Sequence, residues 1–494
     1  MNCLAFDLGA NSGKFAVADY DGKTVKMREI YRFDNSAVQV GESLYWNLGA
    51  IWSGFLEGAE RALVDCPAIS SVGIDTFSND FALISEYGDL MAPVRSYRDT
   101  RTLRCEDAIY ARMSSEELYG ISGNQIAPFN TLMQLAAMCI EGREGLLREA
   151  GALLFLPDYF AYLLAGEQRT ERTIASVSQM YDHGAKDWSD TVLDRFDIEK
   201  RIFAPFIDAG AIAGKIDPYA PGMPGGMGAA HALLVCAVPE HDTAAAFVAA
   251  QGGENTLVVS SGTWTIVGCE ADRPLITDYG FRYNIANEGG LDGHHRLLRN
   301  LMGNWILQEC RREALSEGGE WDYGALSEAA AALPAWERPI DVDHPEFYAP
   351  GNMREKISEL CLKTYGSAPE TPAEITASVC AGLALKTRWA MEKLETLTGR
   401  RFERIDMIGG GSRDLYAAQL TADATGLPVT MGPAEASLLG NIVFQLIAQR
   451  EISGVGEGRE LIKRSMAFTE LEPKAAGVAE DAYIKFCRTF CLQL

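Results

Sequence analysis

The chain opens with short apolar and alternating segments that predict β-strands. NCLAFDL, FAVADY and TVKMREIYRF follow one another within the first 33 residues. Asp21-Gly22 stands between the second and third of these segments, and Asp-Gly between two strands is a strong hairpin signal. Two further strands are predicted at AISSVGIDTF and FALISE. The N-terminal region is therefore expected to be rich in β-structure.

Helical periodicity is found between and after these strands. Apolar residues recur at helical spacing over 48–65, and helices are also predicted over 102–113, 131–150 and 157–165. The Gly- and Pro-rich residues 219–231 predict a loop. Strands that are followed by helices favour a layered α/β architecture.

The region after residue 250 has the same form as the N-terminus. NTLVVSS and WTIVGCE enclose a small polar turn, as LAFDL and FAVADY enclose GANSGK. Farther along, FERIDMI predicts a strand, GGGS a tight turn, and RDLYAAQLTADATG a helix that ends at glycine. The repeated form predicts two similar halves, residues 1–250 and 251–494.

Length and charge limit the classes of function. A chain of 494 residues is expected to hold two domains rather than one core. The formal net charge of −24 argues against nucleic acid and against anionic membrane surfaces as partners. An anionic ligand would have to be held by local N–H groups, a metal ion or a few cationic side chains.

Cysteine usage and hydropathy bear on the compartment. The eleven cysteines show no C-x-x-C spacing, and most have apolar neighbours, which is typical of reduced thiols in a reducing compartment. The chain enters a predicted strand at its first residues, and no uninterrupted apolar run is long enough to span a membrane. We therefore expect a cytoplasmic protein.

Three glycine-containing turns are candidates for a phosphate site. GANSGK (9–14) fails the Walker pattern, because only three residues separate Gly9 from Gly13 and Phe15 replaces the required Ser or Thr. A hairpin loop of this composition can still point backbone N–H groups at phosphate, although it can also be an ordinary turn. SSGTWT (260–265) and GGGS (409–412) are the other two, and the last is expected at a helix N-terminus. Together they favour a nucleotide site, with one hairpin loop from each half.

Two aspartates adjoin these features. Asp7 ends the first strand beside the first loop, where a carboxylate can hold Mg²⁺ through water or can cap its own turn. Asp242 follows the apolar LLVCAV and heads the predicted helix DTAAAFVAA. A carboxylate at a helix start is kept ionised and can remove a hydroxyl proton, or it can be a simple helix cap. His241 beside it is either part of this site or an interior histidine.

In order along the chain, these segments resemble the FGGY carbohydrate kinases, and among them the rhamnulokinases. The resemblance covers nearly the whole chain. It is carried by DLGANSGK, GIDTFSNDF, YRDTRT, PFNTLMQL, LPDYFAYLLAG, HDTAAA, SSGTW, NEGG with LLRNLMGNWILQE, IGGGSRDLYAAQLTADATGLPV, and GPAEASLLGN.

The resemblance implies a two-domain actin-like (ribonuclease H-like) ATPase fold with ATP and Mg²⁺ in a cleft between the domains. It implies that Asp242 is the catalytic base and that Asp7 is the metal-side aspartate. The implied sugar-site positions are Ser78, Asn79, His241, Asp242, Thr243 and Asn300. The implied ATP-side positions are Ala10, Asn11, Ser12, Gly13, Lys14, Thr263, Gln308, Gly410 and Gly411.

The implied reaction is transfer of the ATP γ-phosphoryl group to the C1 hydroxyl of L-rhamnulose, by a monomer or homodimer without nucleic-acid or membrane partners. Rhamnulokinases usually have Trp-Gly-Val-Asp where this chain has Phe77-Ser78-Asn79-Asp80. Another ketose, such as L-fuculose or a pentulose, therefore remains an alternative substrate. A non-catalytic actin-like nucleotide switch or sugar sensor is a further alternative, and the retained Asp7, Asp242 and glycine turns argue against it.

Overall fold

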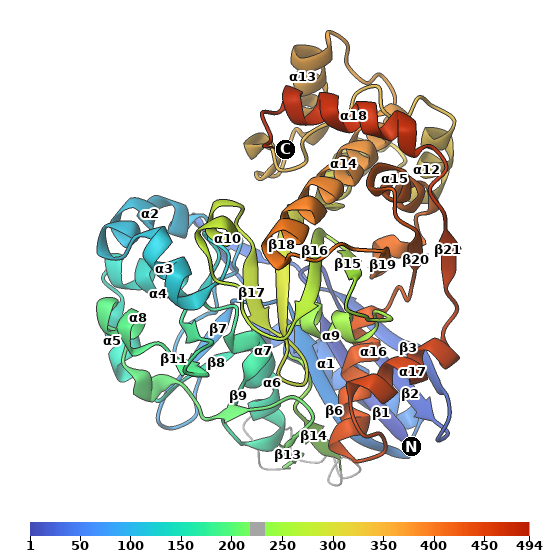
Figure 1. The fold of residues 1–494 in the computed structure, drawn as a ribbon. Helices are drawn as coiled ribbons and strands as arrows, with labels where there is room; N and C mark the ends of the chain where they lie inside the picture. Colours follow the sequence, from blue (N-terminus) through green and yellow to red (C-terminus); the bar gives the residue numbers. More distant parts are fainter. Residues whose placement is uncertain (218–232, 494) are drawn as a thin grey trace. The chain divides into compact units, whose positions relative to one another are not determined.

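The computed structural model describes residues 1–217 and 233–493, so the loop predicted over 219–231 lies outside the described residues. The chain forms two compact units (Figure 1). The first unit consists of Met1–Ala249, Glu270–Leu297 and Ala436–Ser465, and the second of Ala250–Cys269, Leu298–Glu435 and Met466–Leu494. The chain thus returns to the first unit twice, and the simple division into 1–250 and 251–494 stays a prediction.

The first unit is built on a six-stranded sheet with the order β13-β14-β6-β1-β2-β3. Its strands are β1 (Asn2–Leu8), β2 (Ser12–Tyr20), β3 (Val25–Asp34), β6 (Ile69–Thr76), β13 (Ile212–Lys215) and β14 (Leu234–Cys236). The central strand β1 pairs antiparallel with β2 and parallel with β6. The predicted hairpin at Asp21-Gly22 is confirmed, because β2 and β3 pair antiparallel and Gly22 has a φ of 90°.

Helices cover both faces of this sheet. Those that contact its strands are α1 (Leu48–Asp65), α6 (Leu156–Ala165), α9 (Asp242–Val248), α16 (Ala436–Ala448) and α17 (Val455–Ser465). The other main helices of the unit are α2 (Arg101–Arg112), α3 (Ser115–Ser122), α4 (Thr131–Ile140) and α5 (Glu144–Glu149). Shorter elements of this unit are β4 (Val38–Val40), β5 (Ser43–Tyr45), β7 (Phe81–Ile84), β8 (Ala152–Phe155), α7 (Arg172–Ala175), α8 (Asp190–Arg195), α10 (Asp278–Arg282) and β17 (Ala286–Gly289).

One predicted helix is wrong. Residues 131–150 form two helices rather than one, because α4 ends at Ile140 and α5 begins at Glu144. Gly142 between them has a φ of 73°, and Arg143 N donates back to Met138 O at 2.9 Å. A glycine in the left-handed conformation ends a helix, so the apolar periodicity continues across a break in the backbone.

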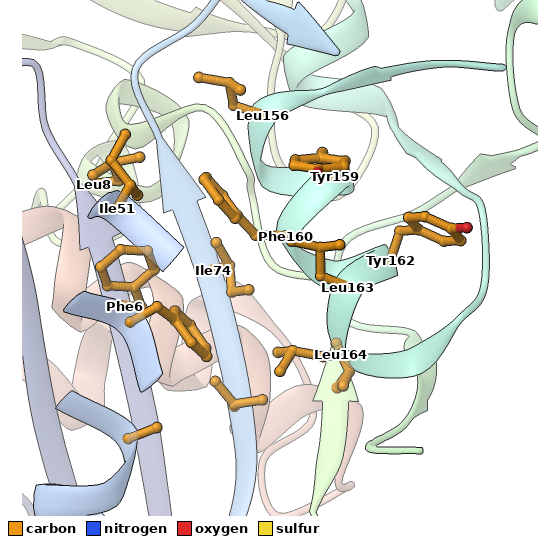
Figure 2. Packing of buried hydrophobic residues seen from close by; sticks show 14 of the residues in the cluster. Phe6, Leu8, Ile51, Ile74, Leu156, Tyr159, Phe160, Tyr162, Leu163 and Leu164 are labelled. Carbon is orange, nitrogen blue, oxygen red and sulfur yellow. The ribbon is translucent and has the colours of Figure 1, made fainter. Parts of the chain in front are cut away.

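The alternation along β1 separates the core from the polar face. Leu4, Phe6 and Leu8 are buried in the cluster formed with α1 and α6, which Figure 2 shows around Phe6 and Phe160. Successive side chains of a strand point to opposite faces. The face that carries Asp7 is therefore the one that packs against α16, whose Gln445 side chain donates to Leu4 O at 2.8 Å.

The second unit contains several strands that belong to it wholly or for the most part. These are β15 (Thr256–Ser261), β16 (Trp264–Ala271), β19 (Arg404–Ile408), β20 (Val429–Met431) and β21 (Thr469–Leu471), and β18 (His295–Met302) enters this unit with its second half. Its helices are α11 (Trp305–Ser316), α12 (Tyr323–Ala331), α13 (Met353–Tyr365), α14 (Pro372–Thr398), α15 (Leu415–Thr425) and α18 (Ala476–Thr489).

The central strands of the two units share one pairing pattern. In the second unit β15 pairs antiparallel with β16 and parallel with β19, as β1 pairs antiparallel with β2 and parallel with β6 in the first. Each unit therefore places a tight hairpin turn beside the end of a parallel strand. These are the two turns that the sequence singles out.

Candidate active site

Two aspartates lie side by side on the sheet of the first unit. Asp7 on β1 is the register partner of Asp75 on β6, and it is also the partner of Lys14 on β2. Lys14 Nζ is 3.8 Å from Asp7 Oδ2. Asp75 is fully buried and accepts a hydrogen bond of 2.7 Å from Asn441 Nδ2 on α16. Burial, and then the charge of Asp7, raises the pKa of Asp75 well above its usual range.

This pair fits a magnesium ion. Asp75 Oδ1 is buried and has no hydrogen-bond partner within residues 1–217 and 233–493. An unsatisfied carboxylate oxygen beside a second carboxylate suits a hard cation that prefers oxygen ligands and keeps several waters. The same described residues contain no group of three or more His, Cys, Asp or Glu side chains that could hold a metal ion. Asp7 and Asp75 would therefore share the cation with water and phosphate oxygens.

The turn between β1 and β2 has the geometry expected of an anion-binding hairpin. Gly9 N donates to Ser12 O at 2.9 Å, which leaves Ala10 and Asn11 at the tip. The backbone N–H groups of Ala10 and Asn11 donate to no acceptor in the described part of the protein. Asn35 closes the base of the turn, because its Nδ2 donates to Gly9 O at 3.0 Å.

Gly13 and Lys14 belong to β2 rather than to the turn. Gly13 pairs with Leu8, and a Cβ on Gly13 would collide with the ring of Phe33. The packing of the sheet therefore requires a glycine at position 13, whatever ligand the hairpin binds. Lys14 keeps a partly buried position beside Asp7, where its ammonium group adds a positive charge near the hairpin.

Asp242 is the first residue of α9, and His241 is its N-cap. His241 makes no side-chain cap hydrogen bond, and the Asp242 carboxylate accepts from the Thr243 hydroxyl at 3.2 Å and lies 3.5 Å from His241 Nε2. The Asp242 side chain is 31% exposed, whereas that of His241 is 10% exposed. Asp242 therefore keeps a partly exposed carboxylate at the start of an otherwise buried helix.

The segment before Asp242 continues the sheet. Thr76 N, at the end of β6, donates to Glu240 O at 2.9 Å, and Thr76 forms a parallel bridge with His241. This pairing places Asp242 near the ends of β1 and β6, and its charge contributes to the raised pKa of Asp75. The structure thus brings the predicted base and the predicted metal-side Asp7 to one edge of the first unit.

Ser78 and Asn79 follow β6 in a tight turn. Asn79 has a φ of 76°, a left-handed conformation that asparagine tolerates and β-branched residues avoid. Its Nδ2 donates to Ser78 Oγ at 2.9 Å, while its buried Oδ1 has no partner among the residues that the structure describes. Thr131 Oγ1 donates to Asn79 O at 2.9 Å and so anchors the turn to α4.

Asp80 fixes the end of this turn. Its carboxylate accepts hydrogen bonds from Trp46 Nε1 at 2.6 Å, Tyr97 N at 2.9 Å and Gln134 Nε2 at 2.8 Å. Burial raises the pKa of Asp80 to about 7. The rings of Phe77 and Trp46 pack in a tilted arrangement with centroids 4.7 Å apart. Aromatic rings and a buried carboxyl group thus hold Ser78 and Asn79 in place.

The predicted ATP-side residues Thr263 and Gln308 meet in the second unit. At the start of α11, Asn304 N donates to Gly262 O at 3.3 Å. Trp305 N donates to Thr263 O at 3.0 Å. Gln308 Nε2 donates to Thr263 Oγ1 at 3.4 Å. Asn300 lies on β18 in the same unit and is partly buried.

The GGGS turn differs from the expectation of a helix N-terminus. Gly410–Arg413 form a short 3-10 turn, and α15 begins afterwards with Asp414 as its N-cap. A Cβ on Gly411 would collide with Ser261 Oγ and lie 2.9 Å from Asn304 Nδ2, whereas a Cβ on Gly410 would meet open space. Packing against β15 therefore requires Gly411, and Gly410 is the glycine that leaves room beside the turn.

The residues predicted for the site divide between the two units. Those that the first unit brings together are Asp7, Ala10, Asn11, Ser12, Gly13, Lys14, Ser78, Asn79, His241, Asp242 and Thr243, and those in the second are Thr263, Asn300, Gln308, Gly410 and Gly411. Sequence reasoning missed Asp75, although an aspartate ends the apolar part of GIDTF much as Asp7 ends LAFDL. It also gave no role to Glu288, although this residue lies in the NEGG segment, or to Arg296, which stands just before LLRNLMGNWILQE.

Comparisons with known proteins identify a family that matches nearly the whole chain. The profile of the FGGY family of carbohydrate kinases, N-terminal domain, matches residues 2–248, and that of the C-terminal domain matches residues 257–449. A protein named rhamnulokinase from Bacteroides thetaiotaomicron is 34% identical over 486 residues, covering 98% of both chains. Another from Enterobacter sp. (strain 638) is 34% identical over 480 residues, covering 96% of this chain and 94% of the other.

A solved structure shows the same fold. The xylulose kinase from Rhodospirillum rubrum superposes with a TM-score of 0.79 at 15% identity and covers 99% of this chain and 98% of its own. At that identity the likeness concerns the fold alone. No helix among residues 1–217 and 233–493 is both long and apolar enough to cross a membrane.

Proposed function

We propose that this chain, which belongs to the FGGY family of carbohydrate kinases, phosphorylates L-rhamnulose at its C1 hydroxyl. The family makes the protein a sugar phosphotransferase that uses ATP, and the predicted two-domain actin-like fold is confirmed. The choice of L-rhamnulose is supported by the names of two relatives that match nearly the full length. The cleft between domains stays a prediction.

Asp242 is the proposed general base. Its partly exposed carboxylate at the first turn of α9 is the observation that carries the proposal, because a base must reach the hydroxyl proton within hydrogen-bond distance. The proton leaves the C1 hydroxyl for the carboxylate as the oxygen attacks the γ-phosphorus in line, and the bond from the γ-phosphorus to the β,γ-bridging oxygen breaks, so that ADP leaves. Ser78, Asn79, His241, Thr243 and Asn300 are the proposed sugar-binding positions.

The phosphates are proposed to meet the two hairpin turns. Ala10 and Asn11 offer backbone N–H groups without protein acceptors, and Lys14 adds a cation. Ser12, Gly13, Thr263, Gln308, Gly410 and Gly411 are the remaining proposed ATP-side positions. Mg²⁺, held by Asp7 with Asp75 beside it, would neutralise phosphate charge when bound.

Another ketose is the alternative substrate, and one observation on the turn after β6 favours it. Asn79 adopts a backbone conformation that suits asparagine and would strain the valine usual in rhamnulokinases. The turn that carries Ser78 therefore differs from the one that a Gly-Val pair would form. L-fuculose or a pentulose could fit this turn better than L-rhamnulose.

The test is ADP release, coupled to a reporter enzyme, across a panel of ketoses that includes L-rhamnulose, L-fuculose, L-ribulose and D-xylulose. Preference for L-rhamnulose in kcat/KM by about tenfold or more supports the proposal, since one well-placed polar contact discriminates at least that strongly. Preference for another ketose assigns the protein to that sugar. We also propose that the protein is cytoplasmic and that it is a monomer or a homodimer. Sedimentation of the purified chain tests the oligomeric state.

A further inference from the structure

The imidazole of His241 lies between two carboxylates. Its Nε2 is 3.5 Å from Asp242 Oδ1, and its Nδ1 is 3.4 Å from Glu288 Oε2 on β17. The side chain of Glu288 is only 3% exposed. Each ring nitrogen therefore faces an acid, and one of these acids is the proposed base.

Arg296 on β18 stands behind this pair. It is completely buried, and its Nη2 lies 3.0 Å from Glu288 Oε2 and 3.5 Å from His241 Nδ1. Arg296 Nε donates to Gly289 O at 3.0 Å, which anchors the guanidinium to the last residue of β17. Burial by itself would raise the pKa of Glu288, but Arg296 and His241 outweigh it and leave the pKa lowered. The charges beside it thus favour the ionised form of Glu288.

Folding alone does not require such a pair. Complete burial of two charges costs free energy that their attraction only partly offsets, and well-packed apolar residues of similar volume commonly serve stability as well. Glu288 and Arg296 come from β17 and β18, whereas His241 and Asp242 come from the start of α9. Two separate elements therefore deliver an oriented ion pair to the side of the imidazole that faces away from Asp242.

We propose that Glu288 and Arg296 are positioning residues of the kinase reaction. Glu288 lies beside Arg296 and orients its guanidinium, Arg296 Nη2 donates to His241 Nδ1, and the Nε2–H group of His241 is thereby directed at Asp242 Oδ1. This leaves Asp242 Oδ2 for the sugar hydroxyl. The hydrogen bond made at one nitrogen of a histidine sets the orientation and the tautomer in which the other nitrogen works. The inference rests on the proposed role of Asp242.

The first test follows the imidazole directly. In protein labelled with ¹⁵N-histidine, the side-chain resonances of His241 are identified by their loss in His241→Asn. We expect these resonances to shift in Glu288→Gln, which keeps the shape of the side chain and removes its charge. Glu395→Gln is the control, because Glu395 is a second buried glutamate with an arginine partner, the exposed Arg401, and it lies in the second unit. Unchanged His241 resonances in Glu288→Gln would overturn the proposal.

The second test is kinetic. We expect Glu288→Gln to lower kcat by about tenfold or more, as loss of an orienting group does in acid–base catalysis, with the KM for ATP unchanged. Glu395→Gln should keep the wild-type kcat. A kcat for Glu288→Gln equal to that of the control would contradict the positioning role.

A double variant separates positioning from folding. Glu288→Leu with Arg296→Met removes both charges together and avoids an unpaired buried ion. If the pair served only stability, this variant would recover wild-type kcat, and the proposal would be overturned. We expect it to fold and to remain slow. Should neither wild type nor Glu395→Gln release ADP with any ketose, the proposed function fails, and the histidine resonances then decide only whether Glu288 orients the imidazole of His241.

Discussion

Asp7 and Asp75 occupy the same register position on two neighbouring parallel strands, β1 and β6. Side chains at such positions project from the same face of the sheet. Asn441 holds one oxygen of Asp75, and the other is buried without a partner in the described part of the chain. Two carboxylates are thus brought together in a polar niche where their mutual repulsion has to be relieved by a proton or a cation.

Replacement of Asp75 should weaken the cation site. Asp75→Asn keeps an acceptor for Asn441 and removes one of the two charges beside the proposed Mg²⁺ position. We expect the affinity for Mn²⁺, measured by electron paramagnetic resonance with a non-hydrolysable ATP analogue, to fall by about tenfold or more. Asp80→Asn is the control, since Asp80 is a buried acid that does not face Asp7. Equal Mn²⁺ affinity in the two variants would exclude Asp75 from the site.

Asp242→Asn should fold and bind ATP and yet lose phosphoryl transfer. The amide is close in shape to the carboxylate and cannot accept the hydroxyl proton, so we expect kcat to fall by a factor of about 10² to 10⁴. ATP binding, followed by the change in tryptophan fluorescence, should stay at the wild-type value. Turnover near that of wild type would show that another group is the base.

The stability of the protein should depend on Asp80 between pH 4 and 7. Burial raises the pKa of Asp80 to about 7 in the folded state from a usual value of 3.8, so the folded protein holds a proton that the unfolded chain releases. The stability that Asp80 contributes through this proton is fully present below the pKa of the unfolded state, and it is lost as the pH rises through the pKa of the folded state. The stability of wild type relative to Asp80→Asn should therefore decline across that interval, by up to about 4 kcal/mol.

Urea unfolding of both proteins at half-unit intervals of pH measures this difference. Asp80→Asn is a suitable partner variant because the Gln134 amide can turn and still pair with the new side chain. A difference that stays constant from pH 4 to 8 would contradict the raised pKa of Asp80.

The turn after β6 should reject a β-branched residue. At a φ of 76°, Asn79→Val is expected to cost about 1–3 kcal/mol of unfolding free energy or to change the turn, whereas Asn79→Gly relieves the backbone and loses only the contact with Ser78. Thermal unfolding of the two variants tests the stability, and the ketose panel tests the turn. Equal stabilities would show that the turn adapts.

The GGGS turn provides a matched pair of variants. Gly411→Ala should lower stability by about 1–3 kcal/mol and raise the KM for ATP, because its Cβ collides with Ser261 and displaces the turn. Gly410→Ala should leave stability unchanged, since its Cβ meets open space. Any effect of Gly410→Ala on the KM for ATP would then report contact with the nucleotide. Thermal unfolding and initial rates at varied ATP measure both effects.

Local patterns predicted the elements of this fold well. The strands β1, β2 and β6, the hairpin at Gly22 and the helix α1 all lie where alternation, turn chemistry and helical spacing place them. The failure at residues 131–150 has a local cause, because a single glycine in the left-handed conformation ends α4 although the apolar periodicity continues. Apolar periodicity indicates which face of a segment is buried, but it does not indicate where the backbone leaves the helical conformation.

The candidate site was predicted wherever its residues adjoin a recognisable motif. Asp7, the first hairpin and the His241–Asp242 segment each stand at a strand end or helix start, so their local context marks them. Asp75 can be recognised as a candidate site residue only because it lies beside Asp7. The register of β1 and β6 brings the two together, although they are separated by more than sixty residues in the sequence. No spacing rule within one segment could have paired them.

The sequence by itself thus determined the family, the strand and helix pattern and the identity of the proposed base, because each depends on short segments with specific residues. The tertiary structure decided which charges meet. It placed Asp75 beside Asp7, and Glu288 with Arg296 behind His241. Burial and pairing energies depend on distances in space between elements remote along the chain, and these distances exist only once the sheet has assembled.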